Sequence, residues 1–316
     1  MAQGKLTLSR LFLLLLALIA PALANAQAAR TEPPKPYVPA LWEVQMGKSR
    51  AYLFGTVHTL PRGVDWFKPH VARALDGSTR LVLETEIPES PAALAPVVMR
   101  LSRLSAARPV KDRVPASWQP ALQAAIGRLN APPMEWNDTW FITLTLANLQ
   151  AEADGLDPRI GVEAVLTERA RMRNLPISAL ETVEEQLTNF DSLPEADQQM
   201  MLMSTLEALP RSKANMTLMI GDWMLGDTDA LAARVNAEFE RSPMLRRLLV
   251  EDRNIRWADW LQMRMKAEEG PIFVAVGAGH LAGRGSLVEE LEKRGMKVAR
   301  VAPEPPQTDR KKRRKR

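Results

Sequence analysis

The stretch PIFVAVGAGH at residues 271–280 decides the fold, because it repeats near the carboxyl end of the chain the pattern of AYLFGTVH at residues 51–58. Each stretch is an apolar run that ends in the motif G-x-x-H, and the run predicts a buried strand. Ligands of α/β sheets bind beyond the carboxyl ends of the strands, and a glycine there lets the backbone turn sharply. The two stretches therefore predict one sheet built from both ends of the chain, with a histidine after each strand.

The segments around these stretches follow the same plan. Two short runs separated by Gly47-Lys48-Ser49 predict a β-hairpin. Strand, helix and strand in succession then predict a crossover and a mostly parallel sheet. The expected strands lie at 41–44, 51–54, 80–87, 175–180, 271–276 and 297–301, and the expected helices lie at 67–75, at 286–294 and throughout 91–264 apart from the strand-like break. The predicted fold class is α/β (α+β), with a central sheet of N- and C-terminal strands and a large helical middle segment.

The first 26 residues have the order of a cleavable signal peptide. Lys5 and Arg10 precede an apolar run and a small-residue stretch that ends at Ala26. The run is shorter than the roughly 20 residues of a membrane-spanning helix, so we expect cleavage after Ala26, with an uncleaved anchor as the alternative. The expected location is periplasmic or secreted. The expected organisation is a signal peptide at 1–26, a proline-rich lead at 27–40, one domain at 41–303 and a disordered basic tail at 304–316.

Charge and cysteine content narrow the possible functions. Of the 42 Lys and Arg, two lie in the signal peptide and seven in Arg310–Arg316, so the body has fewer basic residues than the 37 Asp and Glu. A net acidic body excludes a nucleic-acid partner. The basic tail is expected either to contact an anionic membrane surface or to be solvated without a partner. The chain has no cysteine and therefore no disulfide or thiol chemistry.

Two of the three histidines end the G-x-x-H motifs, at His58 and His280. A third polar residue, Glu84, ends the run RLVLE, where a buried carboxylate is costly unless it is paired or bound to a metal. Two imidazoles and one carboxylate form a three-ligand site with an open position for water, as catalytic metals require. His58, Glu84 and His280 are therefore candidate metal ligands and catalytic residues. The alternatives are hydrogen-bonded structural histidines and a Glu84 that forms a salt bridge with Arg80 or another base.

Arg253 is the fourth candidate catalytic residue. It precedes Asn254 at the predicted start of a helix whose apolar face is expected to include Ile255, Trp260 and Leu261. An arginine near the reaction can hold a substrate carboxylate or stabilise a developing oxyanion. Otherwise the segment is a charged helical turn. The remaining histidine, His70, is expected at the surface.

Together these motifs resemble the TraB/GumN family, which is related to the Tiki proteins and more loosely to the erythromycin esterase and ChaN group. The paired G-x-x-H with the intervening Glu and Arg-Asn is the specific part, and it points to the secreted bacterial GumN-like branch. One departure is Gly161-Val162-Glu163, where a Gly-Leu-Asp type of sequence is expected. The matching stretches are LWEV at 41–44, YLFGTVH at 52–58, LVLE at 81–84, LET at 180–182, EQL at 185–187, GD at 221–222, RN at 253–254 with Trp257, and VGAGHLAG at 276–283.

The resemblance implies a sheet formed by the two chain ends and, in the Tiki branch, a metal-dependent protease that uses manganese or cobalt. Carried over by position, His58, Glu84 and His280 are metal or catalytic residues and Arg253 is a substrate or transition-state contact. We predict a peptidase in which a divalent metal (Mn, Co or Zn) activates water to attack a peptide or protein substrate. The alternative is a protein that binds or sequesters a peptide or small ligand in the same crevice without catalysis.

Overall fold

A six-stranded sheet with helices on both faces organises the computed structural model of this chain, which describes residues 37–85, 91–239, 242–267 and 270–303. The strand order is β4-β3-β5-β2-β1-β6. Strands β2, β5, β3 and β4 run parallel, whereas β1 is antiparallel to both β2 and β6. The strands are β1 (Leu41–Met46), β2 (Ser49–Thr56), β3 (Arg80–Thr85), β4 (Ile177–Glu181), β5 (Ile272–Gly277) and β6 (Lys297–Arg300). The predicted mixed α/β fold is confirmed.

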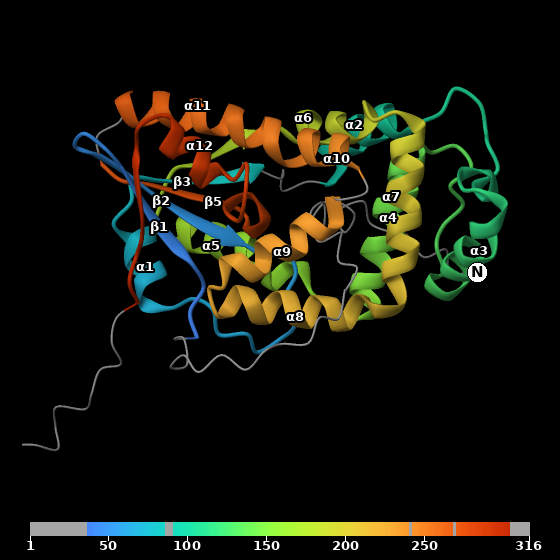
Figure 1. The fold of residues 1–316 in the computed structure, drawn as a ribbon, viewed down its shortest axis with the longest axis horizontal. Coiled ribbons are helices and arrows are strands. Elements are labelled where there is room, and N and C mark those ends of the chain that lie inside the picture. Colours follow the sequence, from blue (N-terminus) through green and yellow to red (C-terminus); the bar gives the residue numbers. More distant parts are fainter. Residues whose placement is uncertain (1–36, 86–90, 240–241, 268–269, 304–316) are drawn as a thin grey trace, which may run out of the picture.

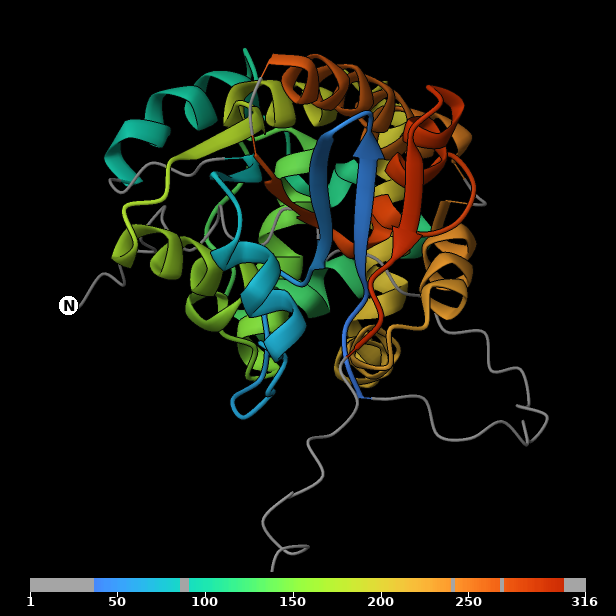
Figure 2. The same cartoon turned by 90° about the vertical axis from the view of Figure 1, so that its left-hand side faces the viewer.

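Both ends of the chain contribute to this sheet, as the sequence predicts. Strand β5, near the carboxyl end, lies between the N-terminal strands β2 and β3, and Ala275 pairs with Phe54 on one side and Leu83 on the other. Figure 2 shows the C-terminal strand, in red, beside the two blue strands of the N-terminal hairpin. The crossover from β2 through α1 to β3 therefore skips one strand position, which β5 fills.

Alternation along the strands builds a separate core on each face of the sheet. Phe54, Leu81 and Phe273 point to the face covered by α1 (Pro69–Asp76), α5 (Val162–Met172) and α8 (Ser212–Met224). Their neighbours Leu53, Val82 and Val274 point to the face covered by α11 (Asp252–Ala267) and α12 (Leu287–Lys293). Because side chains alternate between faces, Glu84 follows Val82 onto the α11 face.

The remaining helices are α2 (Pro91–Ser102), α3 (Gln119–Leu129), α4 (Thr139–Ala153), α6 (Val183–Asp191), α7 (Glu195–Ala208), α9 (Thr228–Phe239) and α10 (Pro243–Arg246). Of these, α3, α4 and α7 pack beyond one end of the sheet (Figure 1). Helices α2, α4, α6 and α10 share one buried cluster, and α3, α4 and α7 share another. In the part of the chain that the structure describes, none of these helices has the length and apolarity needed to cross a bilayer.

The structure corrects two expectations from the sequence, and three others concern residues that it does not describe. Ile255 is 41% exposed, and α11 instead buries Trp257, Ala258 and Leu261, so the predicted apolar face is wrong in part. His70 is buried rather than at the surface, and its Nε2 lies 3.3 Å from the carbonyl oxygen of Pro39. The predicted signal peptide, most of the proline-rich lead and the basic tail lie outside the described residues.

Candidate functional site

The two G-x-x-H motifs lie side by side at the carboxyl end of the parallel strands. Gly55 of β2 pairs with Val276 of β5, and each strand continues directly toward its histidine. A side chain at Gly55 would place its Cβ 3.1 Å from both Cα and Cβ of Ala278. Gly55 is therefore needed for packing, because the absence of a side chain lets the turn at Ala278 in the second motif lie against it.

His58 forms an ion pair with the acidic residue that departs from the expected pattern. Its Nδ1 lies 2.5 Å from Oε1 of Glu163, in the first turn of α5. The start of α5 is held against the loop of His58 because the Val162 N–H donates to the Val57 carbonyl at 3.1 Å. A Cβ at Gly161 would overlap the carbonyl oxygen of His58. A glycine before this helix is thus a steric requirement for bringing Glu163 to the histidine.

Four buried polar atoms at or near His58 make no hydrogen bond among the described residues. They are Thr56 Oγ1, His58 Nε2, Thr59 Oγ1 and Glu163 Oε1, and the last of these contacts His58 Nδ1 as an ion pair. Buried polar groups in folded proteins are normally paired with protein or with ordered water. Three such atoms within four residues indicate a place that receives a polar molecule, either water or a ligand.

The charge on His58 is controlled mainly by its carboxylate neighbour. Burial opposes protonation, but the attraction of Glu163, helped by that of Glu84, outweighs it and raises the pKa of His58 above its usual 6.5. A histidine with one nitrogen held by a carboxylate and the other free has the arrangement of a general base.

Arg253 is the centre of a second, fully buried cluster. Its Nη2 donates to Glu84 Oε1 at 2.5 Å and to Glu181 Oε1, and its Nε donates to Glu181 Oε2 at 3.1 Å. Its Nη1 donates to the Leu249 carbonyl at 3.0 Å and faces His280 Nε2 at 3.2 Å. These contacts engage all five N–H groups of the guanidinium. Arg253 therefore joins the ends of β3 and β4 to the second G-x-x-H motif.

Local structure explains why Arg253 reaches these partners. Glu84 points to the α11 face of the sheet, and Glu181 ends β4 directly opposite Thr85. A π-helical turn, Arg247–Glu251, precedes α11 and presents the Leu249 carbonyl to the guanidinium. Turns of this kind are frequent at functional sites. The guanidinium also lies 4.6 Å from the centre of the Trp257 ring, which limits its orientation.

Both ring nitrogens of His280 are engaged. Nδ1 lies 2.8 Å from Asn254 Oδ1, and the Asn254 amide is oriented by its Nδ2, which donates to the Gly285 carbonyl at 2.7 Å. An amide oxygen only accepts, so these partners assign the proton to Nδ1 and leave Nε2 to accept from Arg253. Burial, reinforced by the positive charge of Arg253, lowers the pKa of His280 to about 3. His280 is therefore neutral at physiological pH.

The two carboxylates around Arg253 differ in their pKa values. Glu84 accepts from Arg253, from Gln186 at 2.7 Å and from the Gly277 N–H at 3.1 Å. Burial raises its pKa, but Arg253 and the two histidines outweigh burial and lower the pKa of Glu84 to about 2. Burial raises the pKa of Glu181, and Glu84 adds to this, while Arg253 opposes it. Glu84 is thus the firmly ionised partner of the guanidinium.

The predicted three-ligand metal set does not fit the side chains in this arrangement. A metal ligand must offer a free lone pair, yet both nitrogens of His280 have partners and Glu84 Oε1 accepts from both Arg253 and Gln186. Glu84 Oε2, which accepts once from the Gly277 N–H, keeps a lone pair. The guanidinium of Arg253 occupies the place of a cation between them. Across the described ranges, His, Asp and Glu side chains form no group of three or more suited to hold an ion. Of the two histidines that end the G-x-x-H motifs, His58 is the one that keeps a free ring nitrogen.

The structure therefore separates the four predicted site residues into two groups. Glu84, Arg253 and His280 are in direct contact, and the base that forms a salt bridge with Glu84 is Arg253. His58 contacts none of them through a hydrogen bond, although the charges of Glu84 and Arg253 act on its pKa.

Sequence reasoning did not assign roles to Glu163 and Glu181. Glu181 ends an apolar run as Glu84 does, and the same argument about a costly buried carboxylate applies to it. Glu163 was visible only as a departure from the expected Gly-Leu-Asp pattern. Its contact with a histidine 105 positions away has no local signal in the sequence.

Comparison with known proteins relates the whole of this domain to a family. A model of the TraB/PrgY/gumN family matches residues 40–300. The chain is 24% identical over 255 residues to the uncharacterized protein YbaP of Shigella flexneri and to that of Escherichia coli (strain K12), which covers 80% of this chain and 92% of each relative. An uncharacterized protein of Treponema pallidum (strain Nichols) is 23% identical over 271 residues, 80% of each chain. No solved structure gives a significant match.

Proposed function

This chain belongs to the TraB/PrgY/gumN family, and on that premise we propose that it hydrolyses peptide bonds beyond the carboxyl ends of β2 and β5, with His58 as the general base. The observation that carries the proposal is the free, buried Nε2 of His58, backed by Glu163 on Nδ1. A catalytic base needs a lone pair directed at its substrate and a partner that fixes the ring. His58 has an unpaired Nε2 and a carboxylate beside Nδ1, which support this role.

The proposed reaction uses a single proton acceptor. His58 Nε2 takes a proton from a water molecule as the water oxygen bonds to the scissile carbonyl carbon. The same proton then passes to the amine nitrogen as the carbon–nitrogen bond breaks. Glu163 stabilises the imidazolium between these steps, and the unpaired hydroxyls of Thr56 and Thr59 are available to donate to the developing oxyanion.

In this proposal, Glu84, Arg253 and His280 position the site instead of contacting the substrate. Arg253 is 1% exposed and all of its N–H groups have partners, so it acts through those partners. Together the three residues tie the ends of β3 and β5 to α11 beside His58. A direct contact of Arg253 with the substrate stays a prediction that would require these partners to exchange.

Peptide cleavage by the mature protein tests the proposal. With a library of fluorescence-quenched peptides, we expect the His58→Ala variant to lose about 10²- to 10⁴-fold in kcat/KM, the usual contribution of a general base. His70→Ala is the matched control, because His70 is also buried but contacts Pro39. Cleavage by His58→Ala at the wild-type rate, or no cleavage of any peptide by the wild type, contradicts the proposal.

The alternative is a metal-dependent form of this hydrolase, in which the predicted divalent ion activates the water. An ion held by His58, Glu84 and His280 requires Arg253 to leave its present position. Metal content measured by mass spectrometry after incubation with Mn, Co and Zn separates the two forms. About one ion per wild-type chain, absent from both His58→Ala and His280→Ala, supports the metal form; no bound ion in an active wild type supports the His58 form.

A binding protein without catalysis is the second candidate function. It is favoured by the contacts of Arg253, whose N–H groups all have partners, so that this guanidinium has no N–H left to donate to an oxyanion. Capture of peptides by the wild type and by His58→Ala with equal affinity, without any product, supports this reading.

We also propose that the protein works in the periplasm or outside the cell. The support is the signal-peptide order of the first 26 residues. N-terminal sequencing of the protein recovered from the periplasm or the medium should start at Gln27. Binding of the full chain, but not of a chain ending at residue 303, to vesicles with anionic lipid tests a membrane role for the tail.

A further inference from the structure

A second cavity lies within the helical middle segment and shares no residue with the site of His58. It is bounded by α4, α7 and α8, and the space inside it that the centre of a water-sized sphere can reach is about 70 Å³. A single water molecule needs roughly 10–15 Å³ on this measure, so the cavity has room for a few water molecules or a short hydrocarbon chain. The question is which chemistry its lining would accept.

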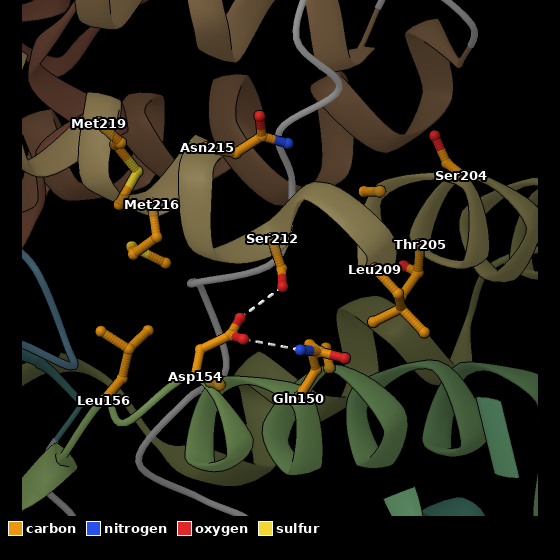
Figure 3. A pocket seen from close by; sticks show the side chains of 13 residues that line it. Gln150, Asp154, Leu156, Ser204, Thr205, Leu209, Ser212, Asn215, Met216 and Met219 are labelled. Atoms are coloured by element: carbon orange, nitrogen blue, oxygen red, sulfur yellow. Dashed lines mark hydrogen bonds between the residues drawn. The ribbon is translucent and has the colours of Figure 1, made fainter. Parts of the chain in front are cut away.

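The walls of the cavity are aliphatic and adaptable. Figure 3 shows Met216 and Met219 of α8 on one side, with Leu156 below them and Leu209 at the far end. Methionine side chains are unbranched and polarizable, so they adapt to ligands of different outline. The lining contains no aromatic residue. An aliphatic body fits these walls, and an aromatic cage for a quaternary ammonium group is lacking.

Asp154 is the charged residue in the lining of the cavity, and the other polar residues there, Gln150, Ser204, Thr205, Ser212 and Asn215, are neutral. Gln150 Nε2 donates to Asp154 Oδ1 at 2.9 Å, and the Ser212 hydroxyl donates to Asp154 Oδ2 (Figure 3). A carboxylate only accepts, so Asp154 fixes the Gln150 amide with its nitrogen toward the carboxylate. The other amide atom, Gln150 Oε1, is buried and has no partner among the described residues, although the side chain lines the cavity.

The charge of the cavity is negative and is not neutralised locally. The partners of Asp154 are the neutral groups of Gln150 and Ser212, and no cation of the described chain forms an ion pair with it. An incoming carboxylate or phosphate would be repelled by Asp154. A ligand with N–H donors and a positive charge would satisfy Gln150 Oε1 and balance Asp154 together.

We propose that this cavity binds an aliphatic primary ammonium ion, with its –NH₃⁺ group between Gln150 Oε1 and the Asp154 carboxylate and its hydrocarbon chain along Met216 and Met219. The three donors of an ammonium group match one orphaned acceptor and the open lone pairs of one carboxylate. The cavity is independent of the proposed hydrolysis, because no residue of the His58 site lines it.

Titration calorimetry with three probes of equal chain length tests the proposal on the mature chain. Hexylammonium should bind at least ten times more tightly than 1-hexanol, and hexanoate should not bind. Equal affinities for hexylammonium and hexanol would overturn the proposal, because the cavity would then recognise only the hydrocarbon chain. Binding of hexanoate would overturn it as well.

Variants locate the binding within the cavity. Asp154→Asn should lower the affinity for hexylammonium at least tenfold while it keeps the hydrogen bond from Ser212. Ala151→Phe should abolish binding by filling the cavity from α4, and its thermal melting should still show a folded chain. Glu152→Gln, an exposed acid on the same helix, and His58→Ala should bind as the wild type does. Unchanged affinity in Asp154→Asn or in Ala151→Phe would show that the ammonium binds elsewhere.

Discussion

His58 and His280 follow neighbouring parallel strands and end the same four-residue motif, yet their environments are opposite. His58 faces a carboxylate, keeps one nitrogen free and has a raised pKa. His280 faces a guanidinium, has both nitrogens engaged and has a pKa lowered to about 3. The motif therefore determines where a histidine lies, and the residues brought from distant helices determine what it can do. The contacts of His58 are those of the base that we propose, whereas the contacts of His280 hold its ring in one position.

The largest effect is expected when the cation of the His280 cluster is removed. Arg253→Met leaves Glu84 and Glu181 buried without their partner, and loss of one member of a buried ion pair costs about 3–5 kcal/mol. Urea denaturation measures the change in the free energy of unfolding. Arg256→Met, an exposed arginine one turn along the same helix, should change it by no more than about 0.5 kcal/mol. A decrease of less than about 1 kcal/mol in the free energy of unfolding of Arg253→Met would show that the guanidinium does not stabilise this cluster.

The two histidines should affect the pH dependence of stability with opposite signs. Unfolded His280 binds a proton below about pH 6.5, whereas folded His280 does so only near pH 3, so its contribution is present above pH 6.5 and is lost on acidification. Between pH 6.5 and pH 5 the loss is about 2 kcal/mol. For His58, whose folded pKa is raised, the contribution is present below pH 6.5 and is lost as the pH rises through the raised pKa.

Urea denaturation of the wild type, His280→Gln and His58→Gln at several pH values measures how the free energy of unfolding of each depends on pH. The difference between wild type and His280→Gln should shrink toward pH 5, and the difference between wild type and His58→Gln should shrink at high pH. If both differences in the free energy of unfolding changed with pH in the same direction, the two histidines would not have opposite environments.

A smaller effect is expected where the two motifs touch. Gly55→Ala introduces a Cβ at 3.1 Å from Ala278 and should destabilise the fold by about 1–3 kcal/mol through overpacking. Combining it with Ala278→Gly should recover part of the loss, because one of the two crowded atoms is removed. Gly127→Ala is the control, since a Cβ in that helical position meets nothing within 4 Å. Strictly additive losses in the double variant would show that the motifs are not in contact.

The smallest change is a displacement of the pH profile. Hydrolysis by neutral His58 should rise with pH through the pKa of the ring, and Glu163→Gln removes the main attraction that raises this pKa. The acidic limb of kcat/KM against pH should therefore move to lower pH. Glu168→Gln, an exposed acid on the same helix, should leave the limb in place. A limb that does not move in Glu163→Gln would assign the titration to another group.

Much of the fold could be predicted because its signals are local. The apolar runs that form β2, β3 and β5, the strand-like break that forms β4 and the turn at Gly295 are each visible within a few residues. The neighbourhood of the site followed from the same signals, since strands that end in polar residues and share one sheet place those residues at one edge. Glu84 and His280 were found in this way.

The chemistry of the site could not be predicted to the same depth. Whether a histidine is a base, a ligand or a structural residue depends on partners such as Glu163 and Asn254, which arrive from helices whose packing has no short-range signature. The metal hypothesis assumed free lone pairs on Glu84 and His280. Only the folded structure shows that a guanidinium lies between them.

The position of β5 between β2 and β3 has a consequence for how the chain is made. The ribosome delivers the amino end first, so β2 and β3 emerge long before residues 272–277, which must lie between them. Until then the facing edges of both strands expose unpaired backbone groups. The sheet and the site at the ends of β2 and β5 can form only when synthesis is nearly complete, so the topology of the sheet slows folding.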